Sequence, residues 1–97
     1  MSILGIEESL ITTAARKKGV NCLCGKESNA YKDSSLRSKV YADIYSQLKR
    51  EFGVTSYKAI KRNQCDIAVS IIKAYELPVI LKEQVENLNN QLDLDID

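Results

Sequence analysis

A chain of 97 residues with 44% hydrophobic and 28% charged residues has the composition of one globular domain with a modest core. No apolar run approaches the roughly 20 residues needed to span a bilayer, and Glu7 and Glu8 stand where a secretion signal would be basic, so we expect a cytoplasmic protein. The chain has no histidine and three cysteines, which excludes a disulfide framework and disfavours a zinc site. We therefore expect no metal and no cofactor, and we expect the cysteines to be small buried residues.

The charges are unevenly distributed along the chain. Residues 12–65 hold twelve Lys and Arg against four acids, a net charge of +8, whereas residues 66–97 have a net charge of −5. A basic middle of this kind faces either nucleic acid or an acidic protein surface. In a dimer, the acidic end could equally neutralise the basic middle of a second copy.

The first predicted element runs from residue 5 to residue 24. Its apolar residues lie roughly on one helical face and include Ile6, Leu10, Ala14, Val20 and Cys24. Gly19 interrupts the pattern, so one long helix and two helices broken near Gly19 both stay open. Gly25 suits the left-handed position after the last turn.

Residues 26–33 are polar and predict a loop, after which Ser34 or Ser35 caps the clearest helix of the chain. An apolar stripe at four- and three-residue spacing defines this helix, and Gly53 ends it. The stripe consists of Leu36, Val40, Tyr41, Ile44, Tyr45, Leu48 and Phe52.

A short turn or half-helix is predicted at residues 56–60, followed by a helix that Asn63 caps. The buried stripe of that helix is predicted to be Ile67, Ala68, Ile71, Ile72 and Tyr75. Pro78 stops it and begins the last helix. The run of alternating Asp and aliphatic residues at 93–97 is expected to fray. Residues 1–97 are thus predicted to form one all-α domain of about four main helices.

The last helix carries a narrow apolar stripe, which consists of Leu81, Val85, Leu88 and Leu92. A narrow seam is typical of a helix that packs against one other helix. The seam could pack on its own domain or pair across a two-fold axis, so a homodimer is one expectation and an intramolecular contact is the other.

No catalytic residues are predicted. Nucleophilic catalysis needs an activated nucleophile beside a base, and histidine, the commonest base, is missing. The carboxylate pairs Glu7/Glu8 and Glu83/Glu86 are typical of solvated helix faces. We therefore expect a binding module rather than an enzyme.

The candidate partner-binding residues are basic or aromatic. Residues 56–75 could form a helix-turn-helix that contacts DNA, but Asp66 would then face phosphate, so a protein-docking role is favoured. Tyrosine suits interfaces because its ring is apolar and its tip is polar. The predicted partner-binding residues are Tyr31, Arg37, Tyr57, Lys58, Lys61 and Arg62.

Several motifs in order resemble the C-terminal domain of phage antirepressor proteins. They are LCGKESNAY at residues 23–31, SLRSKV at 35–40, LKREFGV at 48–54 and SYKAIKR at 56–62, followed by the helix at 68–75 and Leu77-Pro78. The similarity covers roughly residues 15–90. The chain departs from the family at Cys24, where a second glycine is typical, and at residues 63–65, where the family has a more charged run.

The resemblance implies a free-standing copy of a phage or prophage domain, without the DNA-binding module that precedes it in the family. It implies a protein-binding role in the bacterial cytoplasm, in which the domain blocks a phage repressor or a host protein by occupying its surface. The alternative is a small DNA-binding transcriptional regulator that uses the basic middle.

Overall fold

Helices account for most of the computed structural model, which describes residues 5–91. The elements in chain order are α1 (Gly5–Cys22), α2 (Asn29–Lys32), α3 (Ser34–Phe52), the 3-10 turns η1 (Tyr57–Ala59) and η2 (Arg62–Gln64), α4 (Cys65–Ala74) and α5 (Val79–Asn90). The described residues contain no strand, and four of the five α-helices have ten or more residues. The predicted all-α class with four main helices is confirmed.

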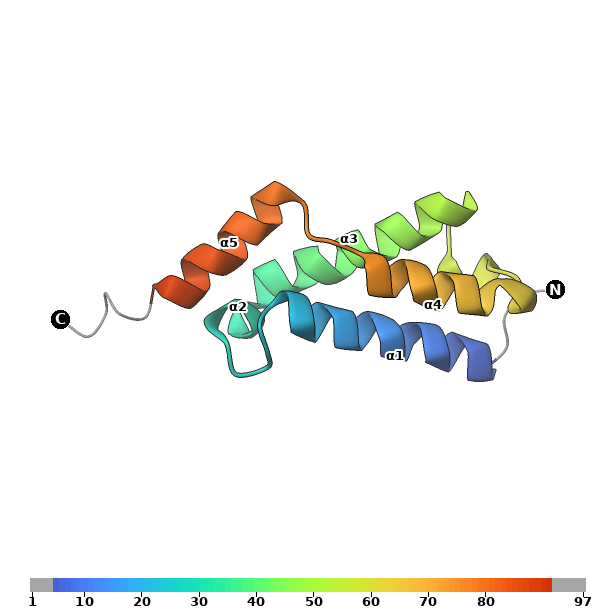
Figure 1. Cartoon of the computed structure of the whole chain (residues 1–97), viewed down its shortest axis with the longest axis horizontal. Helices are drawn as coiled ribbons and strands as arrows, with labels where there is room; N and C mark the ends of the chain where they lie inside the picture. The colour runs from blue at the N-terminus through green and yellow to red at the C-terminus, as the bar shows by residue number, and fades with distance from the viewer. Residues whose placement is uncertain (1–4, 92–97) are drawn as a thin grey trace.

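The helices form a three-helix body with a smaller layer at one end (Figure 1). In the body, α1 packs against both α3 and α4. At the other end, α5 packs on α2 and on α3. The longest helix, α3, is therefore shared by the two parts and lies behind α1 and α4 in Figure 1.

One core of buried side chains runs through both parts of the molecule. The stripe on α3 supplies Leu36, Val40, Ile44 and Leu48, which confirms its predicted inner face. The half-buried Tyr41, Tyr45 and Phe52 flank this stripe. The remaining buried residues are Ile11, Ala15, Leu23, Ala30, Ile60, Cys65, Ala68, Ile72, Tyr75, Leu81 and Val85.

The predicted inner face of α1 is wrong. Ile6 and Leu10 are 75% and 51% exposed, while the buried residues of the helix are Ile11, Ala15 and Gly19. The helix continues without a break through Gly19. Small residues face the core because the ring of Tyr41 on α3 lies against Gly19, where a Cβ would stand 2.3 Å from Tyr41 Cε1. The buried face therefore combines one large apolar residue, Ile11, with two small ones, and the close approach of α3 requires the glycine.

The connections around α2 and α3 differ from their predictions in detail. The predicted loop at residues 26–33 contains the short helix α2, because the Ser28 side chain accepts from Tyr31 N and caps it. Asp33, rather than Ser34 or Ser35, caps α3 by accepting from Leu36 N. Gly25 has a positive φ of 101°, as predicted, and Cys24 before it also has a positive φ of 74°. Gly53 ends α3 as predicted, with a φ of 63°.

The helix α4 also begins later in the chain than the sequence predicts. The helix begins at Cys65 after the 3-10 turn η2, and no side chain caps it, so Asn63 is not its N-cap. The segment before it forms only the single turn η1, which is too short to be the first helix of a helix-turn-helix. Ile67, predicted to be buried, is 54% exposed because Ala68 and Ile72 face the core instead.

The narrow seam on α5 packs on its own domain. Leu81 and Val85 are buried within the chain and Leu88 is partly buried against the same core, whereas Leu92 lies outside the described residues. The homodimer stays a prediction. Two asparagines fix the helix: Asn29 Nδ2 donates to Leu88 O at 3.1 Å, and Asn89 Oδ1 accepts from Ala30 N at 2.9 Å. The predicted fraying of residues 93–97 also falls outside the described residues.

A core substitution tests the packing of α3. Ile44 is 1% exposed, so Ile44→Ala should lower the free energy of unfolding by about 2–5 kcal/mol. The matched control is Ile67→Ala, which removes the same atoms from a 54% exposed position and should have a much smaller effect. Urea unfolding measures both variants, and equal losses would contradict the burial of Ile44.

A pair of glycine substitutions tests the contact between α1 and α3. Alanine is worth about 1 kcal/mol more than glycine inside a helix, yet Gly19→Ala should destabilise the protein because its Cβ would meet the Tyr41 ring. Gly5→Ala is the control, since no described atom lies within 4 Å of its added Cβ. Adding Tyr41→Ala should recover part of the Gly19→Ala loss in thermal unfolding. A stabilising Gly19→Ala would contradict the close approach.

Candidate protein-binding face

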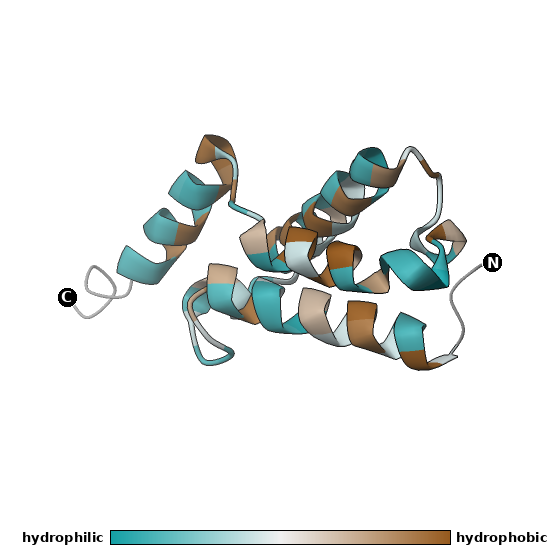
Figure 2. Cartoon of the chain, turned by 45° about the vertical axis from the view of Figure 1, so that its right-hand side comes forward, coloured by the Kyte–Doolittle hydropathy of each residue, from teal (hydrophilic) through white to brown (hydrophobic). Residues whose placement is uncertain are grey.

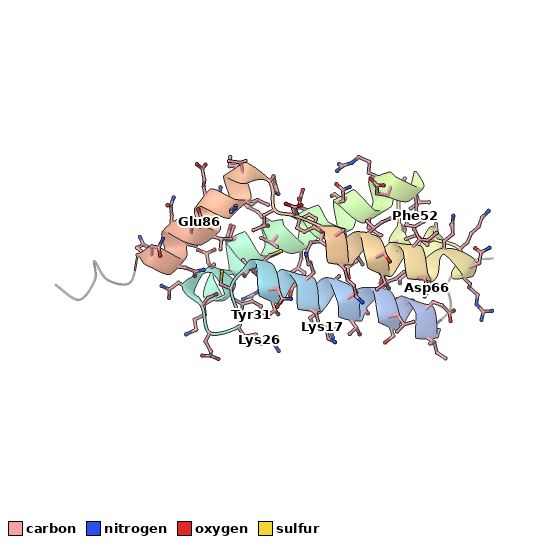
Figure 3. The ribbon with its side chains drawn as sticks, in the orientation of Figure 1. Lys17, Lys26, Tyr31, Phe52, Asp66 and Glu86 are labelled. Atoms are coloured by element: carbon pink, nitrogen blue, oxygen red, sulfur yellow. The ribbon has the colours of Figure 1, made fainter. Side chains whose placement is uncertain are left out.

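The six predicted partner-binding residues fall in two separate places. Tyr31 and Arg37 lie together near α2, beyond the C-terminal end of α1. The other four follow α3, and Tyr57 there contacts Glu8 at the start of α1. From Glu8 to the end of α1 the helix rises about 20 Å, so the two groups lie at opposite ends of the body. Figure 3 shows the same separation between Tyr31 and Phe52.

The basic group after α3 is largely neutralised within the chain. Arg62 Nε lies 3.2 Å from Glu7 Oε1, and Lys58 Nζ lies 3.7 Å from Glu8 Oε1. Both pairs are partly exposed, and such pairs contribute little to stability. They nevertheless place a carboxylate beside two of the three cations. An open hollow of about 630 Å³ at this end is lined by Glu7, Lys61, Arg62 and Asn63, so its lining carries both signs of charge.

Aromatic and arginine side chains lie between the two ends along α1 and α3. We call this set the Tyr–Arg face. Its ends are the predicted Tyr31 with Arg37, and the predicted Tyr57. Its members are Arg16 of α1, Tyr31 of α2, Arg37, Tyr41 and Tyr45 of α3, and Tyr57 of η1.

The six members of the Tyr–Arg face form three contacting pairs. The guanidinium carbon of Arg37 lies 5.0 Å from the centre of the Tyr31 ring, and Arg37 Nη1 donates to Tyr31 O at 2.6 Å. The Tyr41 hydroxyl donates to Arg16 O at 3.0 Å. The rings of Tyr45 and Tyr57 are tilted at 45° with centres 5.3 Å apart. These contacts hold the side chains in fixed positions.

The helical repeat explains why α3 contributes three members. Arg37, Tyr41 and Tyr45 are spaced by four residues, so they lie one above another along one side of the helix. That side borders the buried stripe, which leaves all three side chains half-buried. Their partial burial confirms that Tyr41 and Tyr45 lie at the edge of the core.

Two of the four tyrosine hydroxyls in the Tyr–Arg face donate hydrogen bonds to other residues. Tyr41 and Tyr57 donate to Arg16 O and to Glu8 Oε1, respectively. The hydroxyls of Tyr31 and Tyr45 form no hydrogen bond with another residue in the range 5–91. A half-buried ring with an unused hydroxyl offers both apolar area and a polar tip, the combination that makes tyrosine common at interfaces.

The charged groups beside Tyr41 are cations. Burial raises the pKa of Tyr41, and the neighbouring Tyr31 raises it further, while Arg16 and Arg37 lower it. Burial also raises the pKa of Tyr45, which Arg16 lowers. Carboxylates enter only at the far end, where burial and then the hydrogen bond to Glu8 raise the pKa of Tyr57.

Sequence reasoning missed Arg16 as a member and treated Tyr41 and Tyr45 only as core-edge residues. The four-residue spacing from Arg37 to Tyr45 was a signal that could have joined the last two to the site. Arg16 could not have been found in this way, since the packing of α1 on α3 places it there and the predicted face of α1 was wrong.

The cysteines and acids suggest no further site. All three thiols are free; Cys65 is buried as predicted, Cys22 is partly buried and Cys24 is exposed, which corrects the prediction for Cys24. Within residues 5–91, no three or more Cys, Asp or Glu side chains come together in a way that could hold a metal ion. In the same range, no helix combines the length and apolar character needed to cross a membrane.

Comparison with known proteins gives one match. The family model described as the ORF6C domain matches residues 1–93, nearly the whole chain. No curated protein matches the chain. No solved structure matches it either.

The tyrosines predict a loss of stability at high pH. Burial, followed by the hydrogen bond to Asp43, raises the pKa of Tyr75, and burial raises the pKa of Tyr41, Tyr45 and Tyr57. An unfolded tyrosine has a pKa of about 10. Above that pH the unfolded chain binds fewer protons than the folded one, so the free energy of unfolding should fall as pH rises. Urea unfolding at increasing pH measures the slope.

The Tyr75→Phe variant isolates one contribution to that slope, since it removes the hydroxyl that donates to Asp43 Oδ2. It should be less stable near neutral pH and should lose less stability above about pH 10 than the native chain. An unchanged slope would show that Tyr75 titrates alike in both states.

Proposed function

The chain belongs to the ORF6C domain family, a domain found in phage proteins that include antirepressor-like ones, and we propose that it is a non-catalytic protein-binding module. In this proposal it acts in the cytoplasm of a bacterial host, as an antirepressor C-terminal domain does. It occupies the surface of a phage repressor or a host protein and thereby prevents or modulates that protein's action. The mechanism is steric and needs no chemical step.

The Tyr–Arg face is the observation that carries the proposal. Tyrosine and arginine are the residues that, with tryptophan, contribute most to binding at protein interfaces. Here four tyrosines and two arginines lie along one side of α1 and α3, and contacts with each other or with the backbone order the tyrosines and Arg37 before any partner arrives. Side chains that are already ordered lose less conformational entropy on binding, which favours affinity.

The alternative, DNA binding through the basic middle, receives less support. Two of the cations predicted to contact DNA, Lys58 and Arg62, are paired with Glu8 and Glu7. Asp66 is exposed in the first turn of α4, where it would repel phosphate. Figure 3 shows Asp66 at the same end of the body as the start of α1. The region also lacks the first helix of a helix-turn-helix, since only the 3-10 turns η1 and η2 precede α4.

Affinity purification with paired variants tests the proposal. The native chain is used as bait in the phage-bearing host, and the proteins retained are identified by mass spectrometry. Tyr31→Ala removes one aromatic ring from the Tyr–Arg face and should reduce partner binding by about 1–2 kcal/mol, or roughly tenfold in affinity. Ile67→Ala is the control, because it alters an exposed apolar residue elsewhere, on α4.

The result to compare is the amount of partner that each of the two variants retains. A partner that binds the native chain and Ile67→Ala equally, and binds Tyr31→Ala more weakly, supports the proposal. Circular dichroism must show that both variants remain helical. A partner that is lost with Ile67→Ala and kept with Tyr31→Ala would move the binding surface to α4 and contradict the role of the Tyr–Arg face.

A further inference from the structure

We infer that the Tyr–Arg face binds an acidic segment of a partner protein, with Arg16 and Arg37 receiving its carboxylates. The inference rests on the proposed protein-binding function and specifies the chemistry of the partner. The Tyr–Arg face differs in this respect from the basic group at residues 58–62. That group has more cations close together, but the carboxylates of Glu7 and Glu8 lie beside them.

The two groups of cations differ in whether a carboxylate lies beside them. Lys58 and Arg62 each have a carboxylate within 4 Å, supplied by the first turn of α1. Arg16 and Arg37 have none among residues 5–91. Both residues nevertheless adjoin Tyr41, since Arg16 O accepts from the Tyr41 hydroxyl and Arg37 lies one helical turn before Tyr41 on α3. Two neighbouring cations without a counter-charge form a site that favours an anion.

The geometry of the guanidiniums supports carboxylate binding in particular. Arg37 uses Nη1 for Tyr31 O and rests against the Tyr31 ring, so its plane is held in place. A guanidinium has five N–H donors, and the remaining four can form the paired hydrogen bonds that arginine makes with carboxylates. The side chain of Arg16 forms no hydrogen bond within the described residues, and the residue is exposed.

The aromatic rings favour a protein over a single-stranded nucleic acid. Nucleic-acid platforms of this kind need free ring faces on which successive bases stack. In the Tyr–Arg face, Arg37 covers Tyr31, Tyr45 and Tyr57 pack on each other, and Tyr41 lies against Gly19. These contacts occupy ring faces, and the unused hydroxyls of Tyr31 and Tyr45 suit a polypeptide whose backbone carbonyls accept hydrogen bonds.

A charged-peptide titration tests the inference. The native chain, labelled with ¹⁵N, is titrated with a glutamate decapeptide at low salt, and a glutamine decapeptide serves as the uncharged comparison. We expect amide shifts concentrated near Arg16, Arg37 and Tyr41 with the glutamate peptide only. Raising the salt concentration should weaken the binding, because the charges lie at the surface.

Two double variants with equal net charge show whether the position of the removed charges affects decaglutamate binding. Arg16→Gln with Arg37→Gln should weaken decaglutamate binding by about tenfold, which is the effect of about 1.4 kcal/mol. Lys17→Gln with Lys39→Gln removes the same charge from residues that point elsewhere on α1 and α3 and should change affinity little. Lys17, one residue after Arg16, projects from the outer edge of α1 in Figure 3. Arg16→Gln alone keeps the test valid if the first double variant loses its helicity.

Three results would overturn the inference. Equal weakening by both double variants would show that only total charge matters. A thymidine decamer that binds the same residues more tightly than decaglutamate would identify the face as a nucleic-acid site. Decaglutamate that fails to bind, while a purified partner still depends on Tyr31, would exclude an acidic partner and leave the proposed function standing. Loss of the Tyr31 dependence is the separate result that removes the proposed function.

Discussion

The contact between Gly19 of α1 and Tyr41 of α3 fixes the arrangement on which the rest of the molecule depends. Only a residue without a Cβ lets the Tyr41 ring lie where it does. The hydroxyl of the same ring then donates to Arg16 O, so the contact combines close packing with a hydrogen bond. This approach sets the spacing of α1 and α3, and α4 packs on both of them to complete the body. It also brings Arg16 to the row of side chains on α3.

The second part of the molecule is held by a different kind of interaction. The helix α5 buries only Leu81 and Val85 among its described residues, and its first turn, brown in Figure 2, exposes Val79 and Ile80. Hydrogen bonds from Asn29 and Asn89 supplement this small apolar contact. They tie the end of α5 to α2. The body thus depends mainly on close packing, whereas α5 depends on packing together with polar pairing.

The sequence was sufficient where a single principle decides the outcome. The α3 stripe from Leu36 to Leu48 repeats at helical spacing, so its buried side could be predicted. Where two principles compete, prediction was less successful. On α1, the larger Ile6 and Leu10 are exposed and the smaller Ala15 and Gly19 are buried, because the distance to the neighbouring helices decides, and a sequence does not give that distance. The same difference applies to the candidate site. Its three α3 members could be predicted from their spacing on one helix, whereas Arg16 joins them only through the packing of α1 on α3.

In the ion pairs between the first turn of α1 and the segment at residues 58–62, the acids have sources of stabilisation besides the pairs themselves. Glu7 and Glu8 lie at the N-terminal end of α1, where the helix dipole favours a carboxylate even when no cation is near. Arg62 and Lys58 have no such second source of stabilisation from α1. Glu8 also accepts a hydrogen bond from the Tyr57 hydroxyl at 3.1 Å, so each acid takes part in at least two favourable interactions at this end of the body. Loss of either acid therefore removes several stabilising contacts together: the charge at the start of α1 and the link from α1 to residues 57–62.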